Sequence, residues 1–487
     1  MNIKKRNVIA ALMVAMFLGA IEGTVVTTAI PTIVKDLSGF GLISWVFSIY
    51  FLTSAISTPV YGKLSDLYGR KNMLSIGIVI FLAGSCLCGL SQSMYQLIAF
   101  RALQGLGAGS IFTVTYTIVG DMFALAERAK VQGWLNAVWG IASIIGPFMG
   151  GFLIDFLSWH WVFFINVPFG IISVWLLQKN FSERLEREKR QIDYTGILLL
   201  SAAIMILLAG VPLGGKNTAA ATALTLVLLL VFYFTEKQAK EPIVPLEILT
   251  KNNTVINAIS FLAAAVLIGA DVYIPIFIQN VLGFGATVSG LSMAPMSVSW
   301  LLSSVILAKA IPKYGERVVT FISMFVLLLS CLLLPSFELQ SPLVIVIICN
   351  FIMGLGLGGC FTTMTIAIQT SVGYEKRGAA TALNSLVRTI GHTIGVGIFG
   401  SVFNLNIVGY FNNLGIKGVH PNDIYSAAGH GGNISLQNIQ ISINTALHPV
   451  FLIMIISTAV CIVLSLLLPS ELKEKEKEEK TDSAQPA

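Results

Sequence analysis

The sequence predicts an all-α membrane protein with fourteen transmembrane helices. Of its 487 residues, 55% are hydrophobic and only 11% are charged, and the mean hydropathy is +0.82. A soluble protein carries about 25% charged residues, so this chain has too few to cover a surface in water. In lipid, only helices and closed barrels pair every backbone N–H and C=O group. The apolar runs are long and unbroken, which favours helices over the short alternating strands of a barrel.

A helix needs about 20 apolar residues to cross a bilayer. The first such run follows the basic start MNIKKRN. It is longer than the apolar region of a signal peptide and ends without a cleavage site, so it is predicted to be retained. The expected spans are 7–30, 43–62, 72–91, 96–119, 131–153, 161–178, 194–213, 218–235, 254–279, 287–308, 317–335, 342–367, 379–403 and 448–468.

Lysine and arginine residues lie almost entirely on one side of these spans. If both chain ends and every second loop share a side, that side holds 25 of the 30 basic residues. The other side holds Lys35, Lys216 and Lys417, while Arg101 and Arg388 lie within spans. Because basic loops stay in the cytoplasm, both ends are predicted to be cytoplasmic. The net charge of +6 therefore reflects topology and gives no reason to expect nucleic acid as a partner.

Two segments outside the spans differ from the other loops. Residues 404–447 are predicted to form a long outer loop rich in asparagine and glycine. Within it, NISLQNIQISI (433–443) alternates apolar and polar residues, which predicts a strand of a small hairpin. The charged end ELKEKEKEEKTDSAQPA is predicted to be a solvated tail.

The chain repeats itself weakly. GLGAGSIFT (105–113) matches GLGLGGCFT (354–362) at an offset of 249 residues, and KLSDLYGRK (63–71) is echoed by KAIPKYGER (309–317) at 246. Similar glycine-rich helices alone would not explain the matching loop residues. Parallel repeats are a known plan of transporters, which bind their substrate between the two halves near the membrane midplane. The predicted domains are 1–178, 179–252 with inserted helices at 194–213 and 218–235, 253–468, and the tail 469–487.

Several motifs resemble those of one family of transporters. GKLSDLYGRK (62–71) resembles the loop motif of the major facilitator superfamily, and RALQGLGAG (101–109) resembles its fourth-helix motif. GIASIIGPFMGG (140–151) resembles its antiporter motif. EGTVVTTAIP (22–31) and WHWVFFINVP (159–168) resemble signatures of its fourteen-helix drug–proton antiporters. The resemblance implies two six-helix bundles with two further transmembrane helices inserted between them.

The sequence departs from this family pattern at three positions. Glu22 stands where the antiporters usually have aspartate, which leaves the acid chemistry intact. Leu67 replaces an arginine of the loop, and His160 replaces an arginine between two tryptophans.

Only two acids lie deep in the predicted spans, Glu22 in the first and Asp271 in the ninth. Apolar surroundings disfavour the charged form of a carboxyl group, so such a group can bind and release protons near neutral pH. Once deprotonated, the carboxylate attracts an organic cation. Competition between proton and drug for one site would couple the two fluxes. The alternative for each acid is a buried hydrogen-bonding role without a part in transport.

Other polar and aromatic residues in the spans are candidates for the same site. Arg101 must pair with an acid, a carbonyl group or water. The resemblance makes it part of a proton path, and a purely structural snorkelling or pairing role is the alternative. Arg388 and His392 are four residues apart and share a helix face. Gln104 belongs to the fourth-helix motif. The aromatic candidates for stacking on a cationic drug are Trp45, Tyr50, Trp134 and Trp139, each of which could equally be a packing residue.

Two further motifs are expected to control conformational switching. One is a cytoplasmic charge latch in the loop after the second span, and the other is a kinked contact that seals the pathway. Plain topological charge and ordinary small-residue packing are the alternatives. The latch residues are Gly62, Asp66, Gly69, Arg70 and Lys71, and the residues of the antiporter motif are Gly140, Gly146, Pro147, Gly150 and Gly151.

The predicted function is proton-coupled export of amphipathic, often cationic drugs or dyes across the cytoplasmic membrane of a bacterium. The sequence has no ATP-binding P-loop and no catalytic triad or metal cluster, so we expect a monomeric transporter without a cofactor, not an enzyme. An exporter of the same fold dedicated to one lipid-linked or signalling molecule remains open. A receptor need not keep costly buried acids, and a channel would show a span lined with small polar residues.

Overall fold

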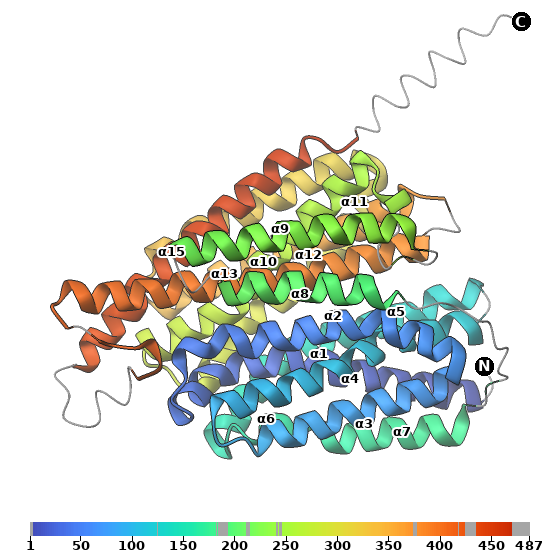
Figure 1. Cartoon of the computed structure of the whole chain (residues 1–487), viewed down its shortest axis with the longest axis horizontal. Helices are drawn as coiled ribbons and strands as arrows, with labels where there is room; N and C mark the ends of the chain where they lie inside the picture. The colour runs from blue at the N-terminus through green and yellow to red at the C-terminus, as the bar shows by residue number, and fades with distance from the viewer. Residues whose placement is uncertain are drawn as a thin grey trace, which may run out of the picture.

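The computed structural model is a bundle of long helices (Figure 1). In the described part of the chain, thirteen helices are long and apolar enough to cross a membrane, and Tyr194–Gly210 is a shorter apolar helix. Together they match the fourteen predicted spans, and the all-α class is confirmed. The described residues are 3–123, 125–181, 183, 193–210, 215–239, 242, 246–373, 377–416, 418–423 and 435–469.

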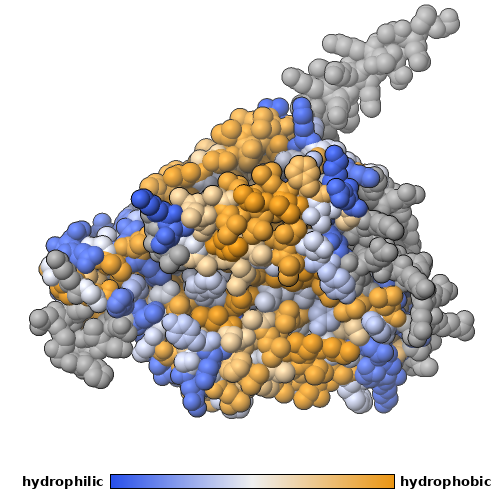
Figure 2. All heavy atoms as spheres, in the orientation of Figure 1, coloured by the Kyte–Doolittle hydropathy of each residue, from blue (hydrophilic) through white to orange (hydrophobic). Residues whose placement is uncertain are grey.

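Hydrophobic residues cover the middle of the face shown in Figure 2, and hydrophilic residues lie towards its two ends. Many large apolar side chains are exposed on the surface; the exposed fraction is 71% for Leu198 and 60% for Phe234. In water such a surface would be unfavourable, whereas a bilayer solvates it with acyl chains. The exposed apolar surface therefore supports a multi-pass membrane protein.

The first helices form what we call the N-terminal group. Their ends follow local signals: the Ser93 hydroxyl accepts from the Gln96 N–H and caps one helix, and Gly69 separates two others with φ +92°. The helices are α1 (Ile3–Asp36), α2 (Ile43–Tyr68), α3 (Arg70–Gly89), α4 (Met94–Met122), α5 (Leu125–Phe156), α6 (Trp161–Phe164) and α7 (Asn166–Asn180).

Two inserted helices follow, α8 (Tyr194–Gly210) and α9 (Gly215–Gln238), and then a C-terminal group. Its helices are α10 (Lys251–Ile276), α11 (Ala286–Leu333), α12 (Leu343–Thr370), α13 (Arg377–Asn413) and α15 (Leu436–Ser465), and a π-helical turn at Phe277–Val281 extends α10.

The long helix α11 contains two predicted spans. Gly315 interrupts it with φ +78° and ψ 160°. Gly69, which lies 246 residues earlier, has φ +92° and ψ 138°. Glycine adopts this left-handed region of φ without the steric cost that a side chain would add. The same backbone conformation therefore recurs at corresponding positions of the two repeats.

The predicted hairpin strand within 433–443 is wrong for the described residues from 436 onwards. They are the start of α15, which begins at Leu436 after the Ser435 cap. Ile439, Ile443 and Leu447 lie four residues apart and are all buried. Helical spacing thus buries one apolar face, which the short alternating pattern did not reveal. The predicted outer loop 404–447 is also shorter than expected, because α13 continues to Asn413. The charged tail 470–487 lies outside the described residues.

The N- and C-terminal groups meet along two seams, α5 against α11 and α2 against α13. We call the end where α1 begins and α15 ends the terminal end (Figure 1). The described hydrogen bonds between the groups lie between mid-helix and the opposite end. They join Ser48 to Thr393, Ser143 to Ser297, Thr28 to Gln279, Asp155 to Thr287, and Gly41 to Asn404 and Asn422.

The inserted helix α8 lies over the α2–α13 seam. Its Leu200, Ile204 and Leu208 pack with apolar side chains of α2, including Leu52, and with Ile390 of α13. These contacts join the inserted segment to both groups at once. They are aliphatic and have no preferred bonding direction.

Gly151 allows α5 to approach α11 closely, and its replacement tests this seam. A Cβ atom at Gly151 would lie 2.5 Å from the Ala286 carbonyl oxygen and from the Thr287 Cα atom. Gly151→Ala should therefore force the helices apart and destabilise the protein by about 1–3 kcal/mol. We expect a thermal unfolding midpoint in detergent a few degrees below that of the wild type.

The matched control is Gly120→Ala in α4, where an added Cβ atom has no neighbour within 4 Å. Alanine favours a helix over glycine, so this variant should melt at or above the wild-type temperature. Equal behaviour of the two variants would show that α5 and α11 do not depend on close backbone contact.

Candidate functional site

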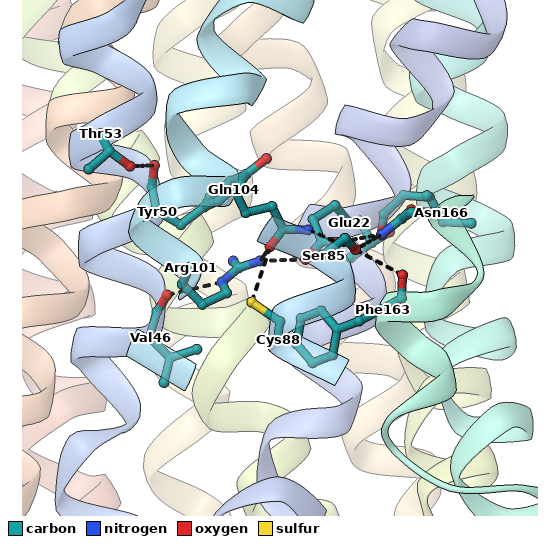
Figure 3. Close-up of polar contacts among 12 residues, drawn as sticks. Glu22, Val46, Tyr50, Thr53, Ser85, Cys88, Arg101, Gln104, Phe163 and Asn166 are labelled. Atoms are coloured by element: carbon teal, nitrogen blue, oxygen red, sulfur yellow. Dashed lines mark hydrogen bonds and ion pairs between the residues drawn. The ribbon is translucent and has the colours of Figure 1, made fainter. Parts of the chain in front are cut away.

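Glu22 lies in the middle of α1 inside a cluster of buried polar side chains (Figure 3). Only 1% of its surface is exposed. It forms an ion pair with Arg101 of α4, which is also 1% exposed. Asn166, at the start of α7, donates to the other carboxylate oxygen over 2.6 Å. Both oxygens of the carboxylate are therefore bound by side chains of other helices.

The surrounding side chains complete this cluster. Arg101 Nη1 donates to Gln104 Oε1 over 2.7 Å, and Arg101 Nε donates to the Val46 carbonyl oxygen over 3.3 Å. Its guanidinium carbon lies 4.1 Å from the centre of the Tyr50 ring. Ser85 of α3 accepts from Gln104 over 3.2 Å and from Asn166 over 3.0 Å. These residues belong to α1, α2, α3, α4 and α7, and Figure 3 shows them converging on Glu22 and Arg101.

The cluster is neutral overall and almost closed. A charge in the hydrocarbon region is costly unless it is paired, and here each charge partners the other. Two buried polar atoms of the cluster have no partner among the described residues, the Tyr50 hydroxyl and Asn166 Oδ1. The site can therefore form a further hydrogen bond beside the ion pair.

The corresponding region of the C-terminal group has different charges. Asp271 of α10 follows Glu22 by 249 residues, the offset of the glycine-rich repeat. It is half-buried, and no ion pair or hydrogen bond joins it to the described chain. At the same offset from Arg101 stands Asn350, which donates to the Ser292 carbonyl oxygen over 2.8 Å. The structure thus brings Glu22 and Arg101 together but leaves Asp271 without a cation.

The predicted latch residues lie at the terminal end. Arg70 binds Asp66 over 3.1 Å and also pairs with Asp121 at the end of α4. Lys71 Nζ donates to the Gln178 carbonyl oxygen over 2.8 Å. The described partners of Arg70 belong to the N-terminal group, and the Lys71 backbone N–H donates to Glu183, just after α7, over 3.2 Å. Gly62 lies in the last turns of α2, and Gly69 forms the turn after it.

The antiporter motif lies where α5 passes between α1 and α11. An added Cβ atom at Gly146 would meet Thr24, and one at Gly150 would meet Val25, both in α1. On the other side, one at Gly140 would meet Leu301 of α11. The Pro147 carbonyl oxygen occupies the space that a Cβ atom of Gly290 would need. The motif therefore permits two close helix contacts at once.

The aromatic candidates lie in different surroundings. Trp45 packs against the α8 cluster, and the Tyr50 ring lies on Arg101. Trp134 packs against the apolar core of the N-terminal group. Trp139 is 38% exposed and stacks on Phe112 with ring centres 5.5 Å apart.

Arg388 and His392 lie on α13 of the C-terminal group. Arg388 Nη2 donates to Thr365 Oγ1 over 2.8 Å. The His392 ring stacks on Phe51 of α2 at 5.2 Å. The shared face predicted for this pair therefore reaches the seam between the two groups.

Sequence reasoning did not single out Asn166, Ser85 and Asp121. Asn166 lies inside the quoted segment WHWVFFINVP, where an amide at the start of an apolar helix was a usable signal. Ser85 resembles many other serines in the spans, and only its position beside Gln104 distinguishes it. Asp121 lies at the end of a span, where an acid is common.

The sequence comparison identifies the family. Residues 12–396 match the Major Facilitator Superfamily. Multidrug transporter protein MdtP of Bacillus subtilis is 37% identical over 82% of this chain and 76% of its own. Multidrug resistance protein 3 of the same organism is 35% identical over 89% and 84%. Multidrug efflux pump SdrM of Staphylococcus aureus is 30% identical over 83% and 91%.

Solved structures agree with this result at the level of the fold. A bacterial homolog of the human lysosomal transporter Spinster, in an inward-facing and unoccupied conformation, superposes with a TM-score of 0.69. The alignment covers 96% of this chain and 98% of that one, with 14% sequence identity. At this identity the likeness concerns the fold alone.

The ion pair between Glu22 and Arg101 predicts strong coupling between substitutions. Glu22→Gln or Arg101→Gln alone leaves one buried charge unpaired, which should cost about 3 kcal/mol. The double variant leaves no charge, so its loss should be smaller than the sum by about 2 kcal/mol. Unfolding equilibria in mixed detergent micelles measure these differences.

Glu22→Gln combined with Glu338→Gln provides the matched additive control, because Glu338 lies exposed in the loop before α12 and shares no partner with Glu22. Additive losses in the Glu22–Arg101 cycle would contradict an energetically coupled pair.

Proposed function

Because the chain belongs to the major facilitator superfamily of transporters, we propose that it exports amphipathic, often cationic compounds in exchange for protons. It is a multi-pass membrane protein related to multidrug efflux pumps. The family consists of transporters and not of enzymes, which agrees with the prediction from the sequence. The cargo, the coupling ion and the orientation belong to the proposal.

The observation that carries the proposal is the buried cluster around Glu22. A carboxylate 1% exposed in the middle of a membrane helix is costly to keep, even with Arg101 beside it. A purely structural pair could be replaced by apolar side chains with little loss of stability. A titrating role explains why the carboxyl group is present in such surroundings.

Protonation of Glu22 would break the ion pair and free Arg101. The guanidinium group would still have the Gln104 side chain, the Val46 carbonyl oxygen and the Tyr50 ring as neighbours. Asn166 would lose a charged acceptor but keep Ser85. Gain and loss of one proton thus rearranges contacts among five helices of the N-terminal group.

Asp271 provides a second carboxyl group in the C-terminal group. Because no described residue neutralises it, its charged form can attract a cationic cargo or a proton. Binding of either one would exclude the other. This competition is the simplest coupling between two opposite fluxes, and it needs no cofactor.

Alternating access would follow from rocking of the two predicted six-helix bundles, 1–178 and 253–468. The described hydrogen bonds that hold the opposite end closed would break in the outward-open state, among them Asp155 to the Thr287 N–H. The Arg70 charge cluster lies at the terminal end. We assign this end to the cytoplasm, in accord with the predicted excess of basic residues.

Dye efflux from inverted membrane vesicles tests the proposal. With an imposed pH gradient, ethidium uptake by vesicles with the wild-type protein should rise, and Glu22→Gln and Asp271→Asn should each lower the gradient-driven rate by about tenfold or more. The physical reason is that neither amide can bind and release a proton.

Glu338→Gln is the control, because it removes an acid from an exposed loop, and it should transport at the wild-type rate. Gradient-driven efflux that survives in both amide variants would reject exchange at these carboxyl groups. If the wild type moves no dye of any kind but exports one metabolite from a cell extract, a dedicated exporter of the same fold replaces the multidrug proposal.

A further inference from the structure

Arg388 is the second arginine within a transmembrane helix, and its surroundings differ from those of Arg101. Its Nη2 donates to the Phe361 carbonyl oxygen over 3.2 Å and to Thr365 Oγ1 over 2.8 Å, both on α12. No acid of the described chain forms an ion pair with it, and its Nε is buried without a partner. Neutral acceptors orient the guanidinium group but leave its charge uncompensated.

An aromatic surface lies beside this charge. The guanidinium carbon is 4.6 Å from the centre of the Phe361 ring. Phe361 in turn stacks on Trp300 of α11, with ring centres 5.2 Å apart and planes inclined by 18°. The cation–π contact stabilises the arginine without neutralising it. Three helices therefore present one cation and two stacked rings.

The same face of α13 reaches the seam between the two groups. His392, one turn after Arg388, stacks on Phe51 of α2, and its Nδ1 is buried without a partner. The adjacent Thr393 carbonyl oxygen accepts from Ser48 of α2 over 3.1 Å. Arg388 thus lies close to the boundary along which repeat-built transporters bind their cargo.

We propose that Arg388, Phe361 and Trp300 form a subsite for the anionic group of a flat aromatic amphiphile, such as a carboxylate or sulfonate. Arginine binds such groups through charge-assisted hydrogen bonds, and the free Nε supplies a donor. The partly buried Trp300 ring, which the buried Phe361 ring backs, binds the flat apolar body of the same molecule. This subsite rests on the proposed export function. It widens the proposed cargo from cations to zwitterions, which carry an anionic group as well as a cationic one.

A pair of dyes that differ in one group tests the subsite. Rhodamine 110 carries a free carboxylate, and rhodamine 123 is its methyl ester. Binding to the detergent-purified protein is measured by fluorescence polarisation without a proton gradient. Arg388→Gln should weaken binding of rhodamine 110 by about tenfold, the loss expected for a charge-assisted hydrogen bond, and leave rhodamine 123 within about twofold.

Two further variants separate this role from a structural one. Arg388→Lys keeps the charge and should restore part of the affinity for the acid. Lys309→Gln removes the same charge from an exposed position of α11 and should change neither dye. Should Arg388→Gln fail to fold, binding of the two dyes by the folded Arg388→Lys protein decides instead. If Arg388→Lys binds rhodamine 110 as tightly as the wild type does, the guanidinium group is not the specific hydrogen-bond donor to the carboxylate.

The subsite is also overturned by equal losses for both dyes, by no loss for either, or by a wild type that does not bind the acid. The proposed export function fails separately, if vesicles with the wild-type protein move neither rhodamine nor ethidium under a pH gradient. Binding and transport therefore judge the two proposals independently.

Discussion

The structure depends on one constraint: a charge inside a bilayer is costly unless another group pairs with it or solvates it. In the N-terminal group this condition is met within the protein, because Glu22 and Arg101 bind each other and Asn166 and Gln104 bind them in turn. Five helices contribute to this arrangement, so packing and electrostatics cannot change separately there. In the C-terminal group, Asp271 and Arg388 have no charged partner in the described chain. In the proposals above, charged groups of the cargo supply these partners.

Much of the fold followed from the sequence, because lipid leaves few alternatives. Apolar length located the spans, and the repeat anticipated the corresponding glycines Gly69 and Gly315. The segment 436–443 was misread, because alternation in so short a stretch also fits one buried helix face. The partners of Glu22 could not be predicted, since Asn166 lies 144 residues away and only packing brings the two together. The stacking of Phe361 on Trp300 likewise depends on tertiary contacts alone.

The two predicted repeats share a glycine conformation at Gly69 and Gly315 but differ in their polar side chains. Acids stand at corresponding positions in α1 and α10, yet Asn350 occupies the place that corresponds to Arg101. An asparagine satisfies its hydrogen bonds without charge, so the second group does not neutralise its own acid. One predicted repeat thus has an internal salt bridge where its counterpart has a neutral amide.

The position of α8 has a mechanical consequence. Its Ile204 and Leu208 pack with Leu52 of α2 and Ile390 of α13, so it bridges the N- and C-terminal groups. In the proposed rocking mechanism these two groups would move relative to each other. No described hydrogen bond joins α8 to α2 or α13, so a shift of α8 along them would break dispersion contacts only. A helix seated in this way can follow the motion while it covers the boundary between α2 and α13 against acyl chains. The inserted pair α8 and α9 would then seal the α2–α13 boundary against lipid while the two groups move. Without this pair, lipid would reach the boundary during every transport cycle.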